Sequence, residues 1–276
     1  MEHKLEPNKI SGLSSTLLIT LWAKAVEYDK PDSLLRDAEA VRMKKMIDYD
    51  FQKFESARLS QVGCCGRAKL FDQEILRFIA QYPDAVVVQL GAGLDARFER
   101  LGRPHVSAWY DLDLPEVMAI RRQLLPEGQT QYLADSLFST SWMETIAAQQ
   151  KPVLLILEGV LMYFSEEKVK AFFANVAEKL PGATLIFDAV PPVAVGQAKH
   201  HDALKKMDNE ERPEFAWTVK NAKTLETWHP AIKIITMHYL SDICRSHYPW
   251  YARALFATGW GKRYCDQRII VMKLVK

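Results

Sequence analysis

Short apolar runs alternate with helical stretches after Pro83, and this alternation is the feature that most restricts the fold of the chain. Apolar runs joined by helices are typical of strands in a parallel sheet that is buried on both faces. The pattern therefore predicts an α/β fold. It predicts a helix over residues 251–260 and seven strands, at residues 85–90, 106–112, 130–134, 152–158, 184–190, 232–240 and 268–275.

Two segments depart from this alternation. Residues 10–80 show helical periods and loop signals only, for example Leu17, Leu21 and Trp22 at helical spacing, and predict amphipathic helices. Residues 191–230 read as a helix followed by a charged loop, which predicts an insertion that closes over the carboxyl edge of the sheet. We therefore expect a helical N-terminal cap at residues 1–82 and a domain at 83–276 that carries a lid at 191–230.

Composition narrows the classes of ligand. With 276 residues, 49% of them hydrophobic, the chain has enough material for one sizeable core. Its net charge of +2 gives no electrostatic case for binding nucleic acid or an anionic membrane. The spacing of the four cysteines and seven histidines predicts neither a disulfide scaffold nor a metal site. No apolar signal segment begins the sequence, so we expect a cytoplasmic protein with a small ligand.

The turn "QLGAGLDARF" follows the first predicted strand and predicts a site for a nucleotide-like ligand. Gly91 and Gly93 let the chain turn sharply and bring its backbone close to a ligand. Ala96 stands where a dinucleotide fingerprint has its third glycine, a permitted replacement, so this motif alone leaves an NAD site open. Asp113 ends the next strand about twenty residues further on and is suited to bind ribose hydroxyls. The alternative is that Asp113 only caps the following helix.

Charged residues elsewhere point to an amino-acid group on the ligand. Glu158 ends the apolar run "PVLLILE", where an ionised carboxylate needs a cationic partner. That partner is either the ammonium of a ligand or a Lys or Arg of the protein. Arg67, which we expect at the start of a helix, could hold a ligand carboxylate with its planar guanidinium. Asp135 and Ser136 follow the third strand and could meet an adenine edge or cap a helix.

Several motifs together resemble one family. The stretches "SGLSSTLLITLWAKAVE", "GRAKLFD", "VVVQLGAGLDARFERL", "WYDLDLPEV", "LEGVLMYFSEE" and "FDAV" are similar to those of leucine carboxyl methyltransferases and tetracenomycin-type polyketide O-methyltransferases. This resemblance implies a seven-strand, mostly parallel, Rossmann-like sheet with a reversed last strand. It also implies S-adenosylmethionine as the cofactor and an O-methyltransferase activity.

The resemblance also implies a role for each site residue. Arg67 would hold the methionine carboxylate, Glu158 would lie near the amino group, and Gly91, Gly93 and their turn would approach the methionine moiety. Asp113 would bind the ribose, and Asp135 and Ser136 would lie beside the adenine. Lys24 is at the position where the family brings a lid residue toward the cofactor. Relatives often carry threonine after the arginine, where this chain has Ala68.

The methyl acceptor is left open between a carboxylate and a phenol. A carboxylate is ionised at neutral pH and needs no general base, whereas a phenol with a pKa near 10 needs one. His200, His201 and Tyr163 are candidates for that base, and Tyr163 could instead orient the acceptor. Two other hypotheses are an NAD-dependent oxidoreductase and a non-catalytic cofactor-binding protein. NAD has no amino-acid end for Arg67 and Glu158 to hold.

Overall fold

A computed structural model describes residues 15–207 and 212–275 of the chain. Seven strands form one sheet in the order β3-β2-β1-β4-β5-β7-β6. All neighbouring pairs from β3 to β5 are parallel, and β7 is antiparallel to both β5 and β6. The strands are β1 Val86–Leu90, β2 Ala108–Asp113, β3 Thr130–Ala134, β4 Val153–Leu157, β5 Thr184–Ala189, β6 Ile232–Tyr239 and β7 Arg268–Leu274.

The predicted strands and the reversed last strand are confirmed. Alternate residues of β4 face opposite sides of the sheet, so Leu155 packs in one apolar core and Leu154 in the other. Both faces are therefore buried, which is why the strands read as continuous apolar runs. The α-helices are α1 Ser15–Glu27, α2 Ala38–Met46, α3 Arg58–Gln81, α4 Arg97–Arg100, α5 Pro115–Leu124, α6 Ser141–Ala147, α7 Glu166–Lys179, α8 Ser241–Cys244, α9 Trp250–Ala257 and α10 Gly259–Cys265.

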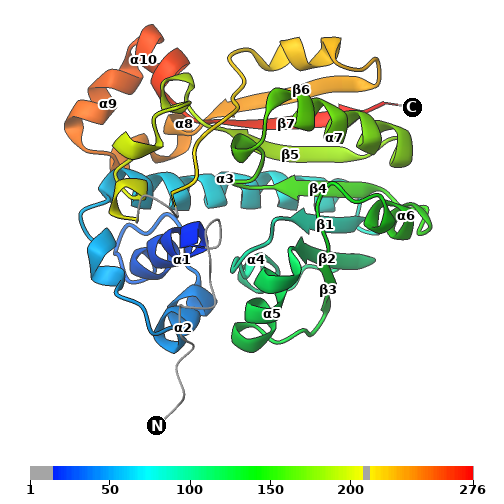
Figure 1. Ribbon diagram of the computed structural model, residues 1–276, viewed down its shortest axis with the longest axis horizontal. Coiled ribbons are helices and arrows are strands. Elements are labelled where there is room, and N and C mark those ends of the chain that lie inside the picture. The colour runs from blue at the N-terminus through cyan, green and yellow to red at the C-terminus, as the bar shows by residue number, and fades with distance from the viewer. Residues whose placement is uncertain (1–14, 208–211, 276) are drawn as a thin grey trace.

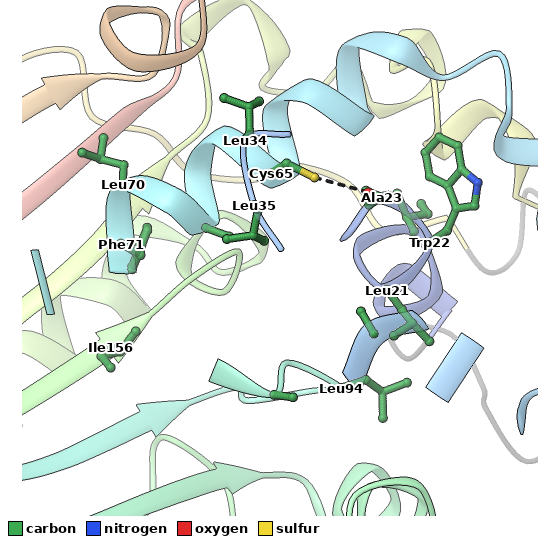
Figure 2. Packing of buried hydrophobic residues seen from close by; sticks show 14 of the residues in the cluster. Leu21, Trp22, Ala23, Leu34, Leu35, Cys65, Leu70, Phe71, Leu94 and Ile156 are labelled. Carbon is green, nitrogen blue, oxygen red and sulfur yellow. Dashed lines mark hydrogen bonds between the residues drawn. The ribbon is translucent and has the colours of Figure 1, made fainter. Parts of the chain in front are cut away.

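The N-terminal helices share a core with the sheet. In Figure 2, Leu21, Trp22 and Ala23 of α1 lie beside α3, and the Cys65 thiol donates to the Ala23 carbonyl at 3.3 Å. Ile156 of β4 belongs to the same apolar cluster. In Figure 1, α1 and α2 lie at the end of the sheet where the parallel strands terminate, as do α9 and α10. The boundary between a cap and a domain at residue 82 remains a prediction, and residues 1–14 lie outside the described part.

One helix begins earlier than expected. Because α3 extends from Arg58 to Gln81, Arg67 lies inside this helix rather than at its start. Gly66 precedes Arg67 within this helix. A Cβ atom at Gly66 would lie 2.6 Å from Cys244 Sγ, so the glycine allows α8 to pack closely on α3.

The insertion follows β5 as expected, but short 3₁₀ turns take the place of the expected α-helix. Pro191 and Pro192 restrict its first residues, and Gly196 has a φ of +68°, outside the α-helical region. Part of the expected charged loop, residues 208–211, lies outside the described residues. The turns are η5 Pro192–Ala194, η6 Ala198–His200, η7 Leu204–Lys206 and η8 Ala222–Thr227. Elsewhere in the described residues, 3₁₀ turns occur at η3 Phe51–Phe54, η4 Leu161–Tyr163 and η9 Arg245–His247.

Asp202 anchors the insertion on α3. Its carboxylate accepts hydrogen bonds from the backbone N–H groups of Leu59 at 2.9 Å and Ser60 at 3.1 Å, and from the Ser60 hydroxyl. These amides belong to the first turn of α3, whose own cap residue, Ala57, has no side-chain acceptor. A residue of the insertion therefore caps a helix more than 140 positions earlier in the chain.

Replacing Asp202 with alanine is expected to lower the free energy of unfolding by about 1–2 kcal/mol, as loss of a helix cap does. Asp202→Asn keeps an oxygen acceptor and should retain most of that stability. Urea denaturation of the two variants beside the wild-type protein measures this. Equal stability of all three proteins would contradict the capping role.

Candidate functional site

A cavity of about 480 Å³ lies where β1 and β4 end. This volume is within the range of small-molecule sites. It brings together most of the predicted site residues: Lys24, Arg67, Gly91, Gly93, Glu158, Tyr163, His200 and His201. A larger groove of about 890 Å³ between α1, α2 and α3 contains none of these residues. We therefore take the cavity at the strand ends as the candidate site.

The glycine turn forms one wall of this cavity. Gly91 and Gly93 have φ values of +68° and +53°, which favour glycine. A Cβ atom at Gly91 would lie 2.5 Å from Val160 Cγ2, and one at Gly93 would lie 2.6 Å from Leu17 Cδ2. Both positions therefore favour glycine for backbone conformation, and Gly91 also leaves space for the Val160 side chain.

Glu158 and Arg67 contact each other at the cavity. The Arg67 Nε atom donates to Glu158 Oε1 at 3.1 Å, and Arg67 Nη1 donates to Asp188 Oδ2 at 3.1 Å. Glu158 Oε2 also pairs with Arg97. Burial alone would raise the pKa of Glu158, but Arg97 and Arg67 lower it below its ordinary value. Glu158 is thus an anion with protein cations as partners, which was one of the two alternatives for it.

These two side chains keep unused hydrogen-bonding capacity. Arg67 has five N–H donors, of which these two contacts use two. Each oxygen of Glu158 has a second lone pair. The pair can therefore bind the carboxylate and the ammonium of an α-amino acid group without losing its mutual contact.

Sequence reasoning missed a network of charges behind this pair. Lys24 Nζ lies 2.8 Å from Asp95 Oδ1, and Asp95 also pairs with Arg97 and Arg100. Asp72 on α3 binds the same two arginines. Although burial opposes it, Arg100, Lys24 and Arg97 hold the pKa of Asp95 well below its usual range.

Asp188 could have been found from the sequence, because it is a carboxylate within the apolar strand "TLIFDAV" and the argument used for Glu158 applies to it.

Asp113 lies beside the glycine turn. Its carboxylate accepts from Gly93 N at 2.7 Å and from Leu114 N at 2.8 Å, just before α5. Leu114 is the N-cap residue of α5 and no side chain caps that helix, so the alternative role of Asp113 as a helix cap is wrong. Burial raises its pKa, opposed by these hydrogen bonds. Asp113 is not among the residues that line the cavity, and its role toward a ribose remains a prediction.

Asp135 and Ser136 follow β3 at the same end of the sheet. Asp135 N donates to Asp113 O at 3.0 Å, and the Asp135 carboxylate accepts from Ser136 N at 2.7 Å and Ser141 Oγ at 2.6 Å. The Ser141 hydroxyl lowers the pKa of Asp135. Neither residue lines the cavity, so their place beside an adenine also remains a prediction.

Tyr163, in the turn η4 after β4, and His201, in the insertion, also line the cavity. Burial raises the pKa of Tyr163 to about 12. Burial also lowers the pKa of His201 from its ordinary value, with Asp202 opposing the shift. At neutral pH, therefore, neither ring is charged.

Two structural features bear on other classes of ligand and location. Among the described residues, no group of three or more His, Cys, Asp or Glu side chains is arranged to hold a metal ion. Within the same residues, no helix has both the length and the apolar character that crossing a bilayer requires.

Comparison with known proteins places the fold and the family. The model of the leucine carboxyl methyltransferase family matches residues 19–177. The tetracenomycin polyketide synthesis O-methyltransferase TcmP of Streptomyces glaucescens is 32% identical over 229 residues, 83% of each chain. The S-adenosyl-L-methionine-dependent methyltransferase dpfgK of Gibberella zeae is 24% identical, with 88% of each chain covered.

Solved structures share the fold at low sequence identity. A DUF574 family protein from Streptomyces avermitilis has a TM-score of 0.57 at 11% identity, with 95% of this chain and 97% of that chain covered. A SAM-dependent methyltransferase from Anabaena variabilis has a TM-score of 0.52 at 11% identity, with 73% and 82% covered. The fold is thus a Rossmann-like methyltransferase sheet. On the family match and the 32% identity to TcmP, the chain belongs to the leucine carboxyl methyltransferase family.

Proposed function

We propose that this protein is an S-adenosylmethionine-dependent O-methyltransferase that methylates a carboxylate or a phenol of a small molecule such as a polyketide. The observation that carries the proposal is the pairing of Arg67 with Glu158 on a cavity beside a glycine turn. An α-amino acid group offers one charge to each of these side chains. The name of dpfgK supports the same cofactor, and that of TcmP supports methyl transfer to oxygen.

The residues present fit such a cofactor. Arg67 would bind its carboxylate and Glu158 its ammonium through the donors and lone pairs that remain free. Gly91 and Gly93 leave no side chain between the backbone and the methionine moiety. Asp113 lies next to that turn, where it can exchange its bond from Gly93 N for one from a ribose hydroxyl. We infer that Asp135 and Ser136 lie beside the adenine and that Lys24 acts as a lid residue toward the cofactor.

Methyl transfer depends mainly on the positioning of the acceptor oxygen and the methyl group. The bound cofactor supplies a methyl group on a positively charged sulfur, which an acceptor oxygen displaces in line. Because charge is neutralised in this step, the protein helps most by excluding water and aligning the oxygen. Helix α1, η4, the insertion and α9 line the cavity and can do this through Ile19, Met162, Leu204, Leu255 and Phe256.

S-adenosylhomocysteine is expected to raise the melting temperature, while NAD at the same concentration leaves it unchanged. At one hundred times its dissociation constant, a ligand stabilises the folded state by about 2.7 kcal/mol. For a chain of this size, that corresponds to roughly 5–10 °C. Differential scanning fluorimetry with both ligands measures it. A shift with NAD alone would favour the oxidoreductase, and S-adenosylhomocysteine binding without methyl transfer to any acceptor would favour a non-catalytic protein.

A further inference from the structure

Large apolar side chains gather on the surface of α9 and α10, which lie at an outer corner of the molecule in Figure 1. Trp250 is 78% exposed, Tyr251 54%, Trp260 60% and Leu255 37%. Each tryptophan pairs with a tyrosine ring of its own helix, Tyr251 at 6.1 Å and Tyr264 at 5.8 Å between centroids. Single exposed apolar residues are ordinary, but a group of them marks an interaction site. We call Trp250, Tyr251, Leu255 and Trp260, with the charged residues between them, the α9–α10 surface.

A tight connection holds the two helices in place. The Thr258 hydroxyl donates to Leu255 O at 2.8 Å and accepts from Gly261 N at 2.9 Å, so it closes α9 and caps α10. A Cβ atom at Gly261 would lie 2.0 Å from Leu255 O, so glycine lets α10 begin this close to the end of α9. The exposed side chains are therefore presented by a defined structure.

Positive charge is concentrated on the same two helices. Residues 245–265 contain Arg245, Arg253, Lys262 and Arg263 and no aspartate or glutamate, a local charge of +4, whereas the whole chain carries +2. The three arginines are exposed, and Lys262 pairs with Asp242 just before this stretch, which leaves +3 when that aspartate is counted. The net charge of the whole chain gives no electrostatic case for an anionic partner, but this local charge does.

Charge disfavours a second copy of this chain as the partner. A two-fold contact places the same surface of both subunits face to face. The exposed Arg253 and Arg263 of one subunit would then lie near the same arginines of the other, and contacts between like charges are unfavourable in an interface. The α9–α10 surface therefore suits a partner that is negatively charged.

Shape and composition favour a lipid surface over an acidic protein as this partner. Aromatic residues that anchor protein interfaces lie at well-packed centres and fill pockets. Trp250 and Trp260 instead stand on helices at an outer corner of the molecule. Tryptophan and tyrosine beside lysine and arginine are typical of segments that lie at the boundary between membrane and water. Anionic lipid headgroups attract each such basic residue.

The α9–α10 surface is continuous with the cavity. Tyr251 and Leu255 are exposed and also line the cavity, so the cavity reaches the molecular surface at α9. Ala252 and Phe256 of the same helix extend this apolar lining inward. A membrane at this surface would therefore face an apolar opening of the cavity.

We propose that the α9–α10 surface binds an anionic lipid membrane, with Trp250 and Trp260 among the lipid headgroups and Arg253 and Arg263 beside the lipid phosphates. None of these four side chains lines the cavity, so the inference goes beyond the proposed function and does not rest on it. The contact is peripheral and reversible, because two short helices bury little apolar area in a bilayer. Its binding can be measured without cofactor or methyl acceptor.

Co-sedimentation of the full-length protein with vesicles tests this binding. Vesicles of phosphatidylcholine with about one-third phosphatidylglycerol are the anionic probe, and vesicles of phosphatidylcholine alone are the neutral control. We expect at least about 10-fold tighter binding to the anionic vesicles, lost when salt reduces the Debye length to about 3 Å. No binding to anionic vesicles, or equal binding to both kinds, would overturn the proposal. Binding to soluble polyglutamate but not to vesicles would assign the surface to an acidic protein and overturn it as well.

Two pairs of arginine substitutions separate local charge from net charge. Arg253→Gln with Arg263→Gln is expected to weaken binding to the anionic vesicles by about 30-fold, the effect of two basic residues near such a surface. Arg103→Gln with Arg122→Gln removes the same charge from exposed positions after α4 and on α5, far from α9 in Figure 1. This control should change the affinity by less than about threefold, because screening confines the effect to nearby charges. Equal losses in both pairs would refute a specific α9–α10 surface.

The tryptophans test whether the rings enter the headgroup region. Lipids with brominated chains quench the fluorescence of tryptophans at the membrane, and we expect Trp250→Phe with Trp260→Phe to abolish most of this quenching although five of the seven tryptophans remain. Trp250→Ser with Trp260→Ser should weaken vesicle binding by about 10-fold or more, and Ile235→Ser, at a 60% exposed position on β6, should leave it unchanged. Undiminished quenching in the phenylalanine variant, or equal affinity of the serine variant and wild type, would overturn the proposal. Unchanged affinity of these variants for S-adenosylhomocysteine keeps either result separate from a failure of the cofactor site.

Discussion

Replacing Arg97 with methionine is expected to lower the free energy of unfolding by about 3–5 kcal/mol, the cost of removing one partner from a buried ion pair. The Arg97 side chain is fully buried and pairs with Asp72, Asp95 and Glu158. Methionine fills much of the same space but leaves these largely buried carboxylates with fewer cationic partners. Urea denaturation at pH 7 measures the loss.

A surface arginine provides the matched control for this substitution. Arg122 pairs with Glu127, and both side chains are 43% exposed, so Arg122→Met should cost less than about 1 kcal/mol. The pH dependence gives a second check on Arg97. A carboxylate whose pKa is lowered by folding adds stability above its unfolded pKa of about 4, and this is lost as the pH falls through its folded pKa. The loss of unfolding free energy caused by Arg97→Met should thus have its full value at pH 7 and become smaller below about pH 4. A deficit equal to that of Arg122→Met would mean that the network contributes little.

The strands could be predicted because each has a local signal in the sequence. A run such as "VLLIL" is apolar throughout because both faces of β4 are covered. The glycine turn follows β1 because its backbone needs positive φ values. The start of α3 could not be predicted from local signals. Gly66 weakens a helix, and only the packing of Cys244 against it explains the residue. The insertion likewise owes its position to Asp202, whose partners on α3 are more than 140 residues away.

The residues of the site could be predicted from the sequence, but the contacts between them could not. Glu158 and Arg67 were recognisable from the charge and shape of their side chains in their sequence contexts. Their contact spans 91 positions, and that of Arg67 with Asp188 spans 121, so it depends on how α3 crosses the ends of β4 and β5. Arg97 was visible in "GLDARF" beside its partner Asp95, but its other partners, Asp72 and Glu158, lie 25 and 61 positions away. Such long-range pairing is set by tertiary packing, which a single sequence does not record.

Glu158→Gln is expected to weaken the binding of S-adenosylhomocysteine by about 1–3 kcal/mol, the scale of a lost charged hydrogen bond. Glutamine keeps the size of the side chain and one oxygen acceptor but removes the negative charge that would meet the ligand ammonium. It also turns an N–H donor toward Arg67 or Arg97, both of which are cations. Isothermal titration calorimetry measures the affinity. Because the fold also loses an ion-pair partner, the titration is done at a temperature where the variant is folded by circular dichroism.

Asp188→Asn separates a direct contact with the ligand from an effect carried by Arg67. Asp188 pairs with the Arg67 guanidinium, as Glu158 does, and its Oδ2 atom lies 3.1 Å from Nη1. Unlike Glu158, it is fully buried and does not line the cavity. Both substitutions therefore remove one negative charge from Arg67, whereas only Glu158→Gln removes one from the cavity wall. If Glu158 binds the ammonium, affinity falls much further in Glu158→Gln than in Asp188→Asn. Equal losses would mean that Glu158 acts by holding Arg67 in place. The ammonium would then need another anion, and Asp95, which lines the same cavity, is a candidate.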